Sequence, residues 1–463
     1  MVAYPDCIRS NSLFRIQIIL FQQSQISMKI TWLIICLSYV VIAIRLFNGY
    51  IQWDISLYIG LAIVPFVFSI EKGILSTRFL IPTLICAVFA LFIPTRSTLF
   101  FTLVFTMLLL FESFKGRINM AFFFVLILIS PIFKFFSDTL GFPLRLWLST
   151  VVAESMAFAG MHARANGNMI SIDNYDFYID QACAGLNMLN VSMLLCLFII
   201  SYHQKKTNTQ LHFLQLMALL LITFSFNVLS NFFRIMAIVI FKIMPGTAMH
   251  EIIGVVCMMI YVILPLIWFI RIFVQRLGKL KPVYDKESHY RGINPILKFQ
   301  YLQLLLFAVV TYLSITTNNV NQFSHNNSNR INLSGYKKTC LANKVLKFEN
   351  KEALIYIKPT PFYAPEHNPM ICWRGSGYEF QFIKKDHIKG IEIYTGILAK
   401  GKDRIYASWW FDNGKIKTVS QFSWRWNGVK SNNFYLVNVN ASRPEDLKRI
   451  TATLLPSPFA GNL

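Results

Sequence analysis

The chain has 463 residues, of which 55% are hydrophobic and 14% are charged, and its formal net charge is +22. Soluble globular domains carry roughly 25% charged residues, so this composition excludes an ordinary soluble protein and indicates a membrane protein with several spanning helices. No nucleic-acid partner is expected, because the cytoplasmic loops of membrane proteins collect Lys and Arg and can hold much of this positive charge.

Residues 1–28 fit the following pattern poorly and are interpreted as an N-terminal extension, with the natural start expected near Met28. Residues 29–316 contain repeated apolar runs, and a spanning helix needs roughly 20 such residues. The nine candidate spans are 29–47, 54–70, 79–95, 97–113, 118–136, 184–202, 211–230, 251–273 and 296–316.

The distribution of Lys and Arg predicts the orientation of these spans. Basic residues are concentrated in the loops near 72–78, 115–117, 205–206 and 271–298, which are alternate loops and should be cytoplasmic. The N-terminus is then inside, and everything after residue 317 is outside.

Two stretches between the candidate spans are not expected to cross the membrane. Residues 142–160, FPLRLWLSTVVAESMAFAG, predict an interfacial helix, and residues 166–180 after them have the period-2 pattern of a short hairpin. Residues 231–250 are apolar over only about ten positions before Pro245-Gly246, and predict a short or re-entrant helix on the outer side.

The composition changes after the last span. Residues 317–335 are rich in Asn and Ser and predict a linker. Residues 336–463 alternate like β-strands, including TVSQFSWRWNGV at 418–429, and end in a helical pattern. Asp412-Asn413-Gly414 predicts a hairpin turn. The expected fold is a polytopic α-helical membrane protein of about nine transmembrane helices with a small C-terminal α+β extracytoplasmic domain.

Three unusual residues fall on the outer side in this topology. Cys183 precedes one span, Arg234 follows another, and His250 precedes a third. A helix N-terminus and a cation both favour a thiolate, a histidine can move the proton, and a guanidinium can stabilise an oxyanion. Asn231 would support this site, and Gly185 would leave room for a substrate backbone. The pattern predicts a cysteine-dependent acyl-transfer site.

Each of these residues also has an ordinary interpretation. A cysteine in a membrane protein is usually a small packing residue, and an arginine or histidine at a helix end is usually an interfacial anchor. The eight cysteines of the chain show no zinc-binding spacing, so neither a metal site nor a cofactor is expected.

Three motifs in order resemble the exosortase/archaeosortase family: ACAGLNML around Cys183, NFFRIMAIVIF around Arg234 and MHEIIGV around His250. The resemblance covers about residues 80–275. Members of that family are polytopic membrane cysteine transpeptidases. The resemblance implies that Cys183 is the nucleophile, that Arg234 is the essential arginine and that His250 is the catalytic histidine.

The resemblance also implies the substrate and the location. The substrates would be exported proteins whose C-terminal sorting signal combines a short motif, a transmembrane helix and a basic tail. The cleaved protein would pass to an acceptor such as a membrane lipid or a surface polysaccharide. The active site and the C-terminal domain would face the periplasm from the bacterial cytoplasmic (inner) membrane.

The C-terminal part carries a second resemblance. HNPMICWRGSGYEF, residues 367–380, is similar to the signature of the exosortase-associated periplasmic domain, and the fusion looks most like the exosortase N type. Cys372 would be a second reactive thiol or would form a disulfide with Cys340, which an oxidising compartment permits.

Two other classes of function stay open from the sequence. A transporter or exopolysaccharide-assembly protein without protease activity could line a path with Arg234 and His250, because ionisable residues in membranes mark such paths. A non-catalytic scaffold could present the C-terminal domain. Neither the sorting motif nor the oligomeric state can be predicted from the residues.

Overall fold

A computed structural model describes residues 33–45, 50–51, 53–71, 76–93, 95–172, 175–179, 186–243, 247–280, 295–317, 331–341, 345–362, 378–430 and 434–456. The chain divides into two compact units. The first unit comprises Met1–Gln52, Ile70–Ile118 and Val283–Asn321, and the second comprises Trp53–Ser69, Asn119–Pro282 and Gln322–Leu463.

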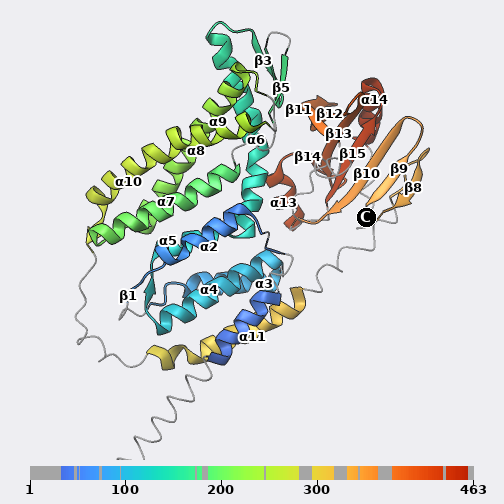
Figure 1. Cartoon of the computed structure of the whole chain (residues 1–463). Coiled ribbons are helices and arrows are strands. Elements are labelled where there is room, and N and C mark those ends of the chain that lie inside the picture. The colour runs from blue at the N-terminus through green and yellow to red at the C-terminus, as the bar shows by residue number, and fades with distance from the viewer. Residues whose placement is uncertain are drawn as a thin grey trace, which may run out of the picture. The chain divides into compact units, whose positions relative to one another are not determined.

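The first unit is a group of apolar helices (Figure 1). A helix at Leu33–Arg45 and α11 (Pro295–Thr317) share a core with α3 (Leu80–Phe92) and α4 (Arg96–Phe114). Thr95 caps α4 in a reciprocal capping box with Thr98. The core residues are Ile35, Tyr39, Ala90, Leu99, Leu103, Leu110, Val310 and Leu313.

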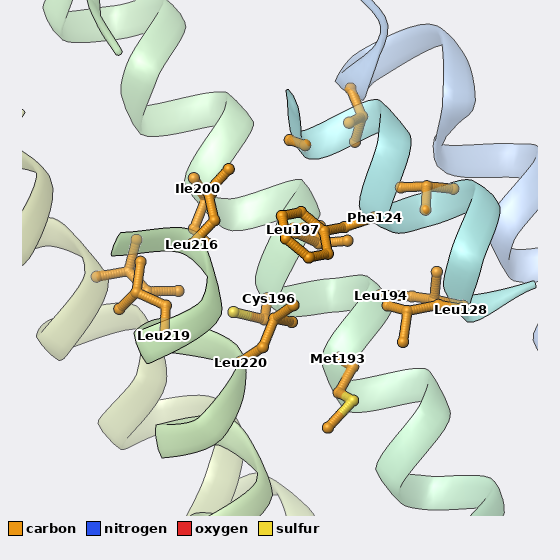
Figure 2. Packing of buried hydrophobic residues seen from close by; sticks show 14 of the residues in the cluster. Phe124, Leu128, Met193, Leu194, Cys196, Leu197, Ile200, Leu216, Leu219 and Leu220 are labelled. Carbon is orange, nitrogen blue, oxygen red and sulfur yellow. The ribbon is translucent and has the colours of Figure 1, made fainter. Parts of the chain in front are cut away.

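The membrane part of the second unit is built around one central helix. α7 (Leu186–Thr207) packs against α2 (Ile55–Val67), α5 (Met120–Leu128), α8 (Phe213–Ile240) and α10 (Leu264–Leu277). Figure 2 shows the side chains that meet in this core, including Cys196, which is fully buried among leucines. Cys196 is therefore a packing residue, as expected for most cysteines of this chain.

The predicted span at 118–136 is broken. α5 ends at Leu128, and α6 (Pro131–Phe158) begins after a bend of 64°. Ser130 caps α6 by accepting a hydrogen bond from the Phe133 N–H, and Pro131 occupies the first turn, where its missing N–H is not needed. The interfacial helix predicted at 142–160 is the second half of this same helix rather than a separate element.

The prediction of a short or re-entrant helix at 231–250 is wrong. α8 continues without a break from Phe213 to Ile240. The polar residues Asn231 and Arg234 lie on one buried face of this helix and do not interrupt it. α9 (Ala248–Met258) then starts a new helix at the N-cap Thr247.

The next helix contains a wider turn. α9 passes into a π-helical segment, η2 (Met259–Ile263), which leads into α10. Pro265 in the first turn of α10 cannot donate to residue 261, and its ring would crowd that carbonyl group in a regular helix. The π turn accommodates this residue. Tyr261 within the π turn stacks on Phe233 of α8 with ring centroids 4.4 Å apart.

Among the described residues, three helical segments are long and apolar enough to cross a membrane, or four if the bent α5–α6 pair counts as one span. The three are Arg96–Ser113, Phe213–Ile240 and Ala248–Leu277. Each of the nine candidate segments contains a helix, but several of these helices are shorter than a span. The protein is a helix-rich membrane protein with a β-rich C-terminal region, and nine spans stay a prediction.

Two short strand pairs join loops that carry basic residues. In the first unit, β1 (Ile70–Glu71) pairs with β2 (Arg117–Ile118). In the second unit, β6 (Thr209–Gln210) pairs with β7 (Lys279–Leu280). Each pair holds together two loops that the charge pattern assigns to the same side of the membrane.

The hairpin predicted at 166–180 is present and has a third strand. β3 (Ala163–Asn166), β4 (Met169–Ile172) and β5 (Tyr175–Tyr178) form an antiparallel sheet. Its buried residues pack on the second half of α6 and on the last turns of α8. This sheet is the last described element before the segment that contains Cys183.

The C-terminal domain is a twisted antiparallel sheet with helices. The strand order is β11-β12-β13-β15-β10-β9-β8, and β14 (Lys417–Thr418) pairs with β13. Alternate residues of β15 enter two cores on opposite faces, so all eight of its residues are buried. The other bounds are β8 (Lys337–Cys340), β9 (Leu346–Glu349), β10 (Ala353–Thr360), β11 (Glu379–Ile388), β12 (Ile391–Lys400), β13 (Asp403–Asp412), β15 (Phe434–Ala441) and α14 (Pro444–Leu454).

One strand prediction in this domain is wrong. The sequence predicts a strand at 418–429. Most of that range belongs instead to a helix, α13 (Gln421–Lys430). Only Trp424 of its aromatic residues is fully buried, where it stacks on Phe411 of β13 at 4.7 Å. The predicted turn at Asp412-Asn413-Gly414 is confirmed, with a φ of 85° at Gly414.

Cys340 lies in the strand β8 at one end of the sheet, where its side chain is exposed and its thiol is free. The structure therefore does not contain the disulfide with Cys372 that the sequence left open. Cys372 itself lies outside the described residues.

Candidate active site

The segment that carries the predicted nucleophile precedes α7. Cys183 and Gly185 lie outside the described residues, which resume at Leu186, the first residue of α7. The described residues that flank this segment are Ile179 and Leu186. Ile179 is buried in the core under the β3–β4–β5 sheet, and Met188 lies in the first turn of α7.

The second predicted element, α8, presents a polar face to the protein interior. Asn227, Ser230, Asn231 and Arg234 are spaced at three and four residues, so they lie on one face of the helix, and all four are buried. Asn227 Nδ2 donates a 2.6 Å hydrogen bond to Ser192 Oγ of α7. This contact fixes the rotation of α8 against α7, and the rotation directs the same face of α8, including Arg234, inward.

Arg234 is the buried cation of this face. Only 2% of its surface is exposed, and its Nη1 donates to the sulfur of Met188 at 3.8 Å. A guanidinium inside a membrane protein is costly unless it lies in a polar site, so such a residue marks a candidate functional position. The contact places Arg234 against the first turn of α7, five residues after Cys183 in the sequence.

Gly254 brings α9 to the same point. A Cβ atom at Gly254 would lie 2.9 Å from Cζ and from Nε of Arg234, and 2.7 Å from Cε of Met188. The absence of a side chain at Gly254 lets the helix approach the guanidinium without displacing the Arg234 and Met188 side chains. α7, α8 and α9 therefore meet at Arg234.

His250 lies one turn before Gly254 on α9. The side chain of His250 is buried with 2% exposure, and its backbone N–H is capped by Thr247, whose Oγ1 lies at 3.4 Å. Residues four apart share a helix face, so His250 and Gly254 are on the same side of α9. The structure thus brings the helix that carries His250 to Arg234, and the catalytic roles of the two residues stay a prediction.

Asn231 lies one turn before Arg234 and is 6% exposed. Neither its Oδ1 nor its Nδ2 has a hydrogen-bond partner among the described residues. A buried amide without partners costs roughly 1–3 kcal/mol, so a group that is retained in this state is a candidate for binding a ligand.

The described residues contain no cluster of three or more His, Cys, Asp or Glu that could hold a metal ion. The described groups on these helices that could take part in chemistry are the guanidinium of Arg234, the imidazole of His250 and the amide of Asn231. The sequence reasoning missed Met188 and Gly254. The spacing of Gly254 from His250 by one helical turn was a readable signal, whereas nothing local distinguished Met188.

Residues 73–268 match the family model of the transmembrane exosortases. This region of the chain belongs to the exosortase family. No curated protein and no solved structure matches the chain.

The exosortase region includes Cys183, Asn231, Arg234 and His250, and it ends within α10. It agrees with the resemblance seen in the sequence over about residues 80–275. The C-terminal β-rich domain lies beyond the matched residues, so its kinship with exosortase-associated domains stays a prediction.

Proposed function

We propose that this exosortase is a membrane cysteine peptidase or transpeptidase that cleaves C-terminal sorting signals of exported proteins. The observation that carries the proposal is the contact of Arg234 with Met188 and with the glycine position of α9. A buried guanidinium where α7, α8 and α9 meet, against the first turn of the helix that follows Cys183 in the sequence, is a group that an acyl-transfer site can use to stabilise an oxyanion.

The residues would divide the reaction as follows. His250 takes the proton of the Cys183 thiol, the thiolate attacks the scissile carbonyl carbon, and the electrons of the carbonyl move to its oxygen, which Arg234 stabilises. The tetrahedral intermediate collapses, the C–N bond breaks, and His250 gives a proton to the leaving amine. The resulting thioester is attacked by an acceptor nucleophile or by water, which regenerates Cys183.

Asn231 would hold the substrate rather than react with it. Its free amide can donate to a peptide carbonyl oxygen and accept from a peptide N–H, and both atoms are available. Gly185 would leave space for that backbone. In this proposal the signal helix of the substrate lies in the membrane with its basic tail in the cytoplasm, so that cleavage occurs on the periplasmic side of a bacterial inner membrane.

The acceptor would be a membrane lipid or a surface polysaccharide. The C-terminal domain carries 20 Lys and Arg against 10 Asp and Glu in residues 331–463, a balance of +10 that favours anionic partners. The placement in the exosortase N type, with this domain as an exosortase-associated domain, belongs to the same proposal.

The test is co-expression of the full chain with an exported protein that ends in a motif, a transmembrane helix and a basic tail. Cys183→Ala should abolish cleavage, and Arg234→Ala and His250→Ala should each reduce its rate by about 10²-fold or more. Pairing either with Cys183→Ala should add little, because members of one catalytic unit are not additive. Membrane abundance of each variant is measured alongside.

Cys196→Ala is the matched control, since Cys196 is a buried cysteine of the same helix region that packs among leucines. It should process the substrate at close to the rate of the unmodified chain. If the Cys183→Ala variant cleaves the substrate at the rate of the unmodified chain, the peptidase is rejected. The alternative, a membrane transporter or exopolysaccharide-assembly protein without protease activity, is then favoured.

A further inference from the structure

The turn between β3 and β4 contacts the C-terminal domain through a buried side chain. Asn168 is fully buried, and its Oδ1 accepts a 2.9 Å hydrogen bond from the backbone N–H of Ile383 in β11. The turn is also held on α6, because Ser149 Oγ donates a 2.6 Å hydrogen bond to the carbonyl oxygen of Gly167. Asn168 therefore joins two parts of the second unit that are 215 residues apart in the sequence.

β11 is irregular where it meets this turn. It is the end strand of the sheet order, and its register against β12 shifts between Gln381 and Lys384. Phe382 within the shift has a φ of 52°, which is uncommon for a residue with a side chain. A bulge takes a residue out of the strand ladder, and here it makes the Ile383 N–H available to Asn168.

The two surfaces fit closely at Gly167. This residue has a φ of 64°, and a Cβ atom on it would lie 2.0 Å from the carbonyl oxygen of Ile383. Gly160 provides a comparison, since it also has a positive φ, of 87°, but a Cβ atom there would meet nothing within 4 Å. The approach of β11 thus depends on the missing side chain at Gly167.

Asn168 also contacts Ile179, which precedes the predicted nucleophile in the sequence. Its carbonyl oxygen accepts a 2.9 Å hydrogen bond from the N–H of Ile179. Ile179 is buried with 3% exposure and stands four positions before Cys183. One residue therefore contacts the C-terminal domain with its side chain and, with its backbone, Ile179, the last described residue before Cys183.

A second contact supports the same docking. The guanidinium of Arg425 in α13 lies 4.6 Å from the ring centroid of Phe135 in α6. Its Nη1 donates a 2.7 Å hydrogen bond to the carbonyl oxygen of Phe362 within its own domain. The C-terminal domain thus meets α6 and the β3–β4 turn that α6 supports.

We propose that the C-terminal domain is a positioning element of the peptidase site, which it reaches through Asn168. Docking of the β11 bulge fixes the β3–β4 turn, and the turn fixes Ile179 and the start of the segment that presents Cys183. The inference rests on the function proposed above, because it assigns Asn168 a role through Cys183. Asn168 is a positioning residue in this scheme and does not touch the substrate.

The test compares Gly167→Ala and Asn168→Ala with Gly160→Ala in the full chain, in membranes and at matched abundance. Two readouts are taken: cleavage of the tailed substrate, and the alkylation rate of Cys183 without substrate, followed by mass spectrometry of its peptide. We expect both Gly167→Ala and Asn168→Ala to lose about 10²-fold in cleavage, because small misplacements of a reacting group have effects of that size. Alkylation of Cys183 should fall roughly tenfold, since the thiol loses the surroundings that favour thiolate.

Gly160→Ala shares the strain of a positive φ but not the contact, so it should keep both rates. Arg425→Ala disturbs the docking from the other domain, and should lower both rates in the same direction by a smaller factor. If the Gly167→Ala and Asn168→Ala variants fail to accumulate in the membrane, the two rates of Arg425→Ala still test the proposal.

The outcomes separate this inference from the proposed function. If cleavage requires Cys183 but Gly167→Ala, Asn168→Ala and Arg425→Ala all behave like Gly160→Ala, the C-terminal domain does not position the nucleophile. If Cys183→Ala cleaves normally, the peptidase itself is rejected.

Discussion

Asn227 and Asn231 lie one turn apart on the same buried face of α8, and they differ in their surroundings. Asn227 Nδ2 donates to Ser192 Oγ at 2.6 Å and to the Thr223 carbonyl oxygen at 2.8 Å. Asn231 has no hydrogen-bond partner among the described residues for either amide atom. Asn227 thus has the hydrogen bonds of a structural amide, whereas Asn231 is the candidate binding amide of the proposed function.

We predict opposite effects of removing the two amides. Asn231→Leu should leave thermal stability unchanged or raise it, because it removes a buried unpaired polar group whose cost is roughly 1–3 kcal/mol, yet it should lower substrate cleavage. Asn227→Leu should lower stability, because it deletes two hydrogen bonds between or within helices. Thermal unfolding of the detergent-solubilised chain and the cleavage assay measure the two effects. An equal loss of stability in both variants would mean that Asn231 has a structural partner.

At the scale of elements, a buried ion pair closes the end of α4. Glu112 is fully buried and accepts hydrogen bonds from Arg78 Nε at 3.1 Å and from the Ile118 N–H at 2.8 Å. Arg78 also donates to the carbonyl oxygen of Ile118 at 2.5 Å. These bonds tie the start of α3 to the short strand β2 and thereby set the turn that follows α4.

We predict that Glu112→Ala destabilises the protein by about 3–5 kcal/mol, because it leaves the guanidinium and the Ile118 N–H without their carboxylate partner. The double variant Arg78→Met with Glu112→Leu should recover a large part of that loss, since apolar replacement of both partners leaves no unpaired buried charge. Thermal unfolding of the two variants decides the question. A double variant less stable than Glu112→Ala would contradict the ion-pair account.

For the whole molecule, the distribution of basic residues predicts the side of the membrane on which each loop lies. The pairs β1–β2 and β6–β7 each connect two loops that carry basic residues, including Arg117 and Lys279. Lys205 Nζ at the same end of α7 donates to the Phe66 carbonyl oxygen at 2.6 Å. Within each unit, the pairing of two basic loops agrees with a shared side of the membrane for those two loops.

We predict that reporter fusions at residues 206 and 340 report opposite compartments, with residue 206 cytoplasmic and residue 340 periplasmic. The first position lies in the last turn of α7 and the second in β8 of the C-terminal domain. A cytoplasmic and a periplasmic reporter at each site give the measurement. The same compartment at both positions would show that the number of spans between them is even.

The sequence by itself determined the class of protein, the helical segments and most strands of the C-terminal domain, because apolar periodicity and β-alternation are local properties. It also indicated the exosortase family, since three short motifs occurred in order. Ser130 followed by Pro131 is also a local signal for the start of α6, because serine is a preferred N-cap and proline suits the first turn of a helix.

Only the tertiary structure decided where these elements meet. α8 continues past Asn231 because its polar side chains turn inward to α7, and α13 is a helix because Trp424 alone is buried in the domain core. Met188, Gly254 and Asn168 acquire their roles from residues distant in the sequence. Such contacts depend on how helices and sheets pack, and the residue types on either side in the sequence do not record them.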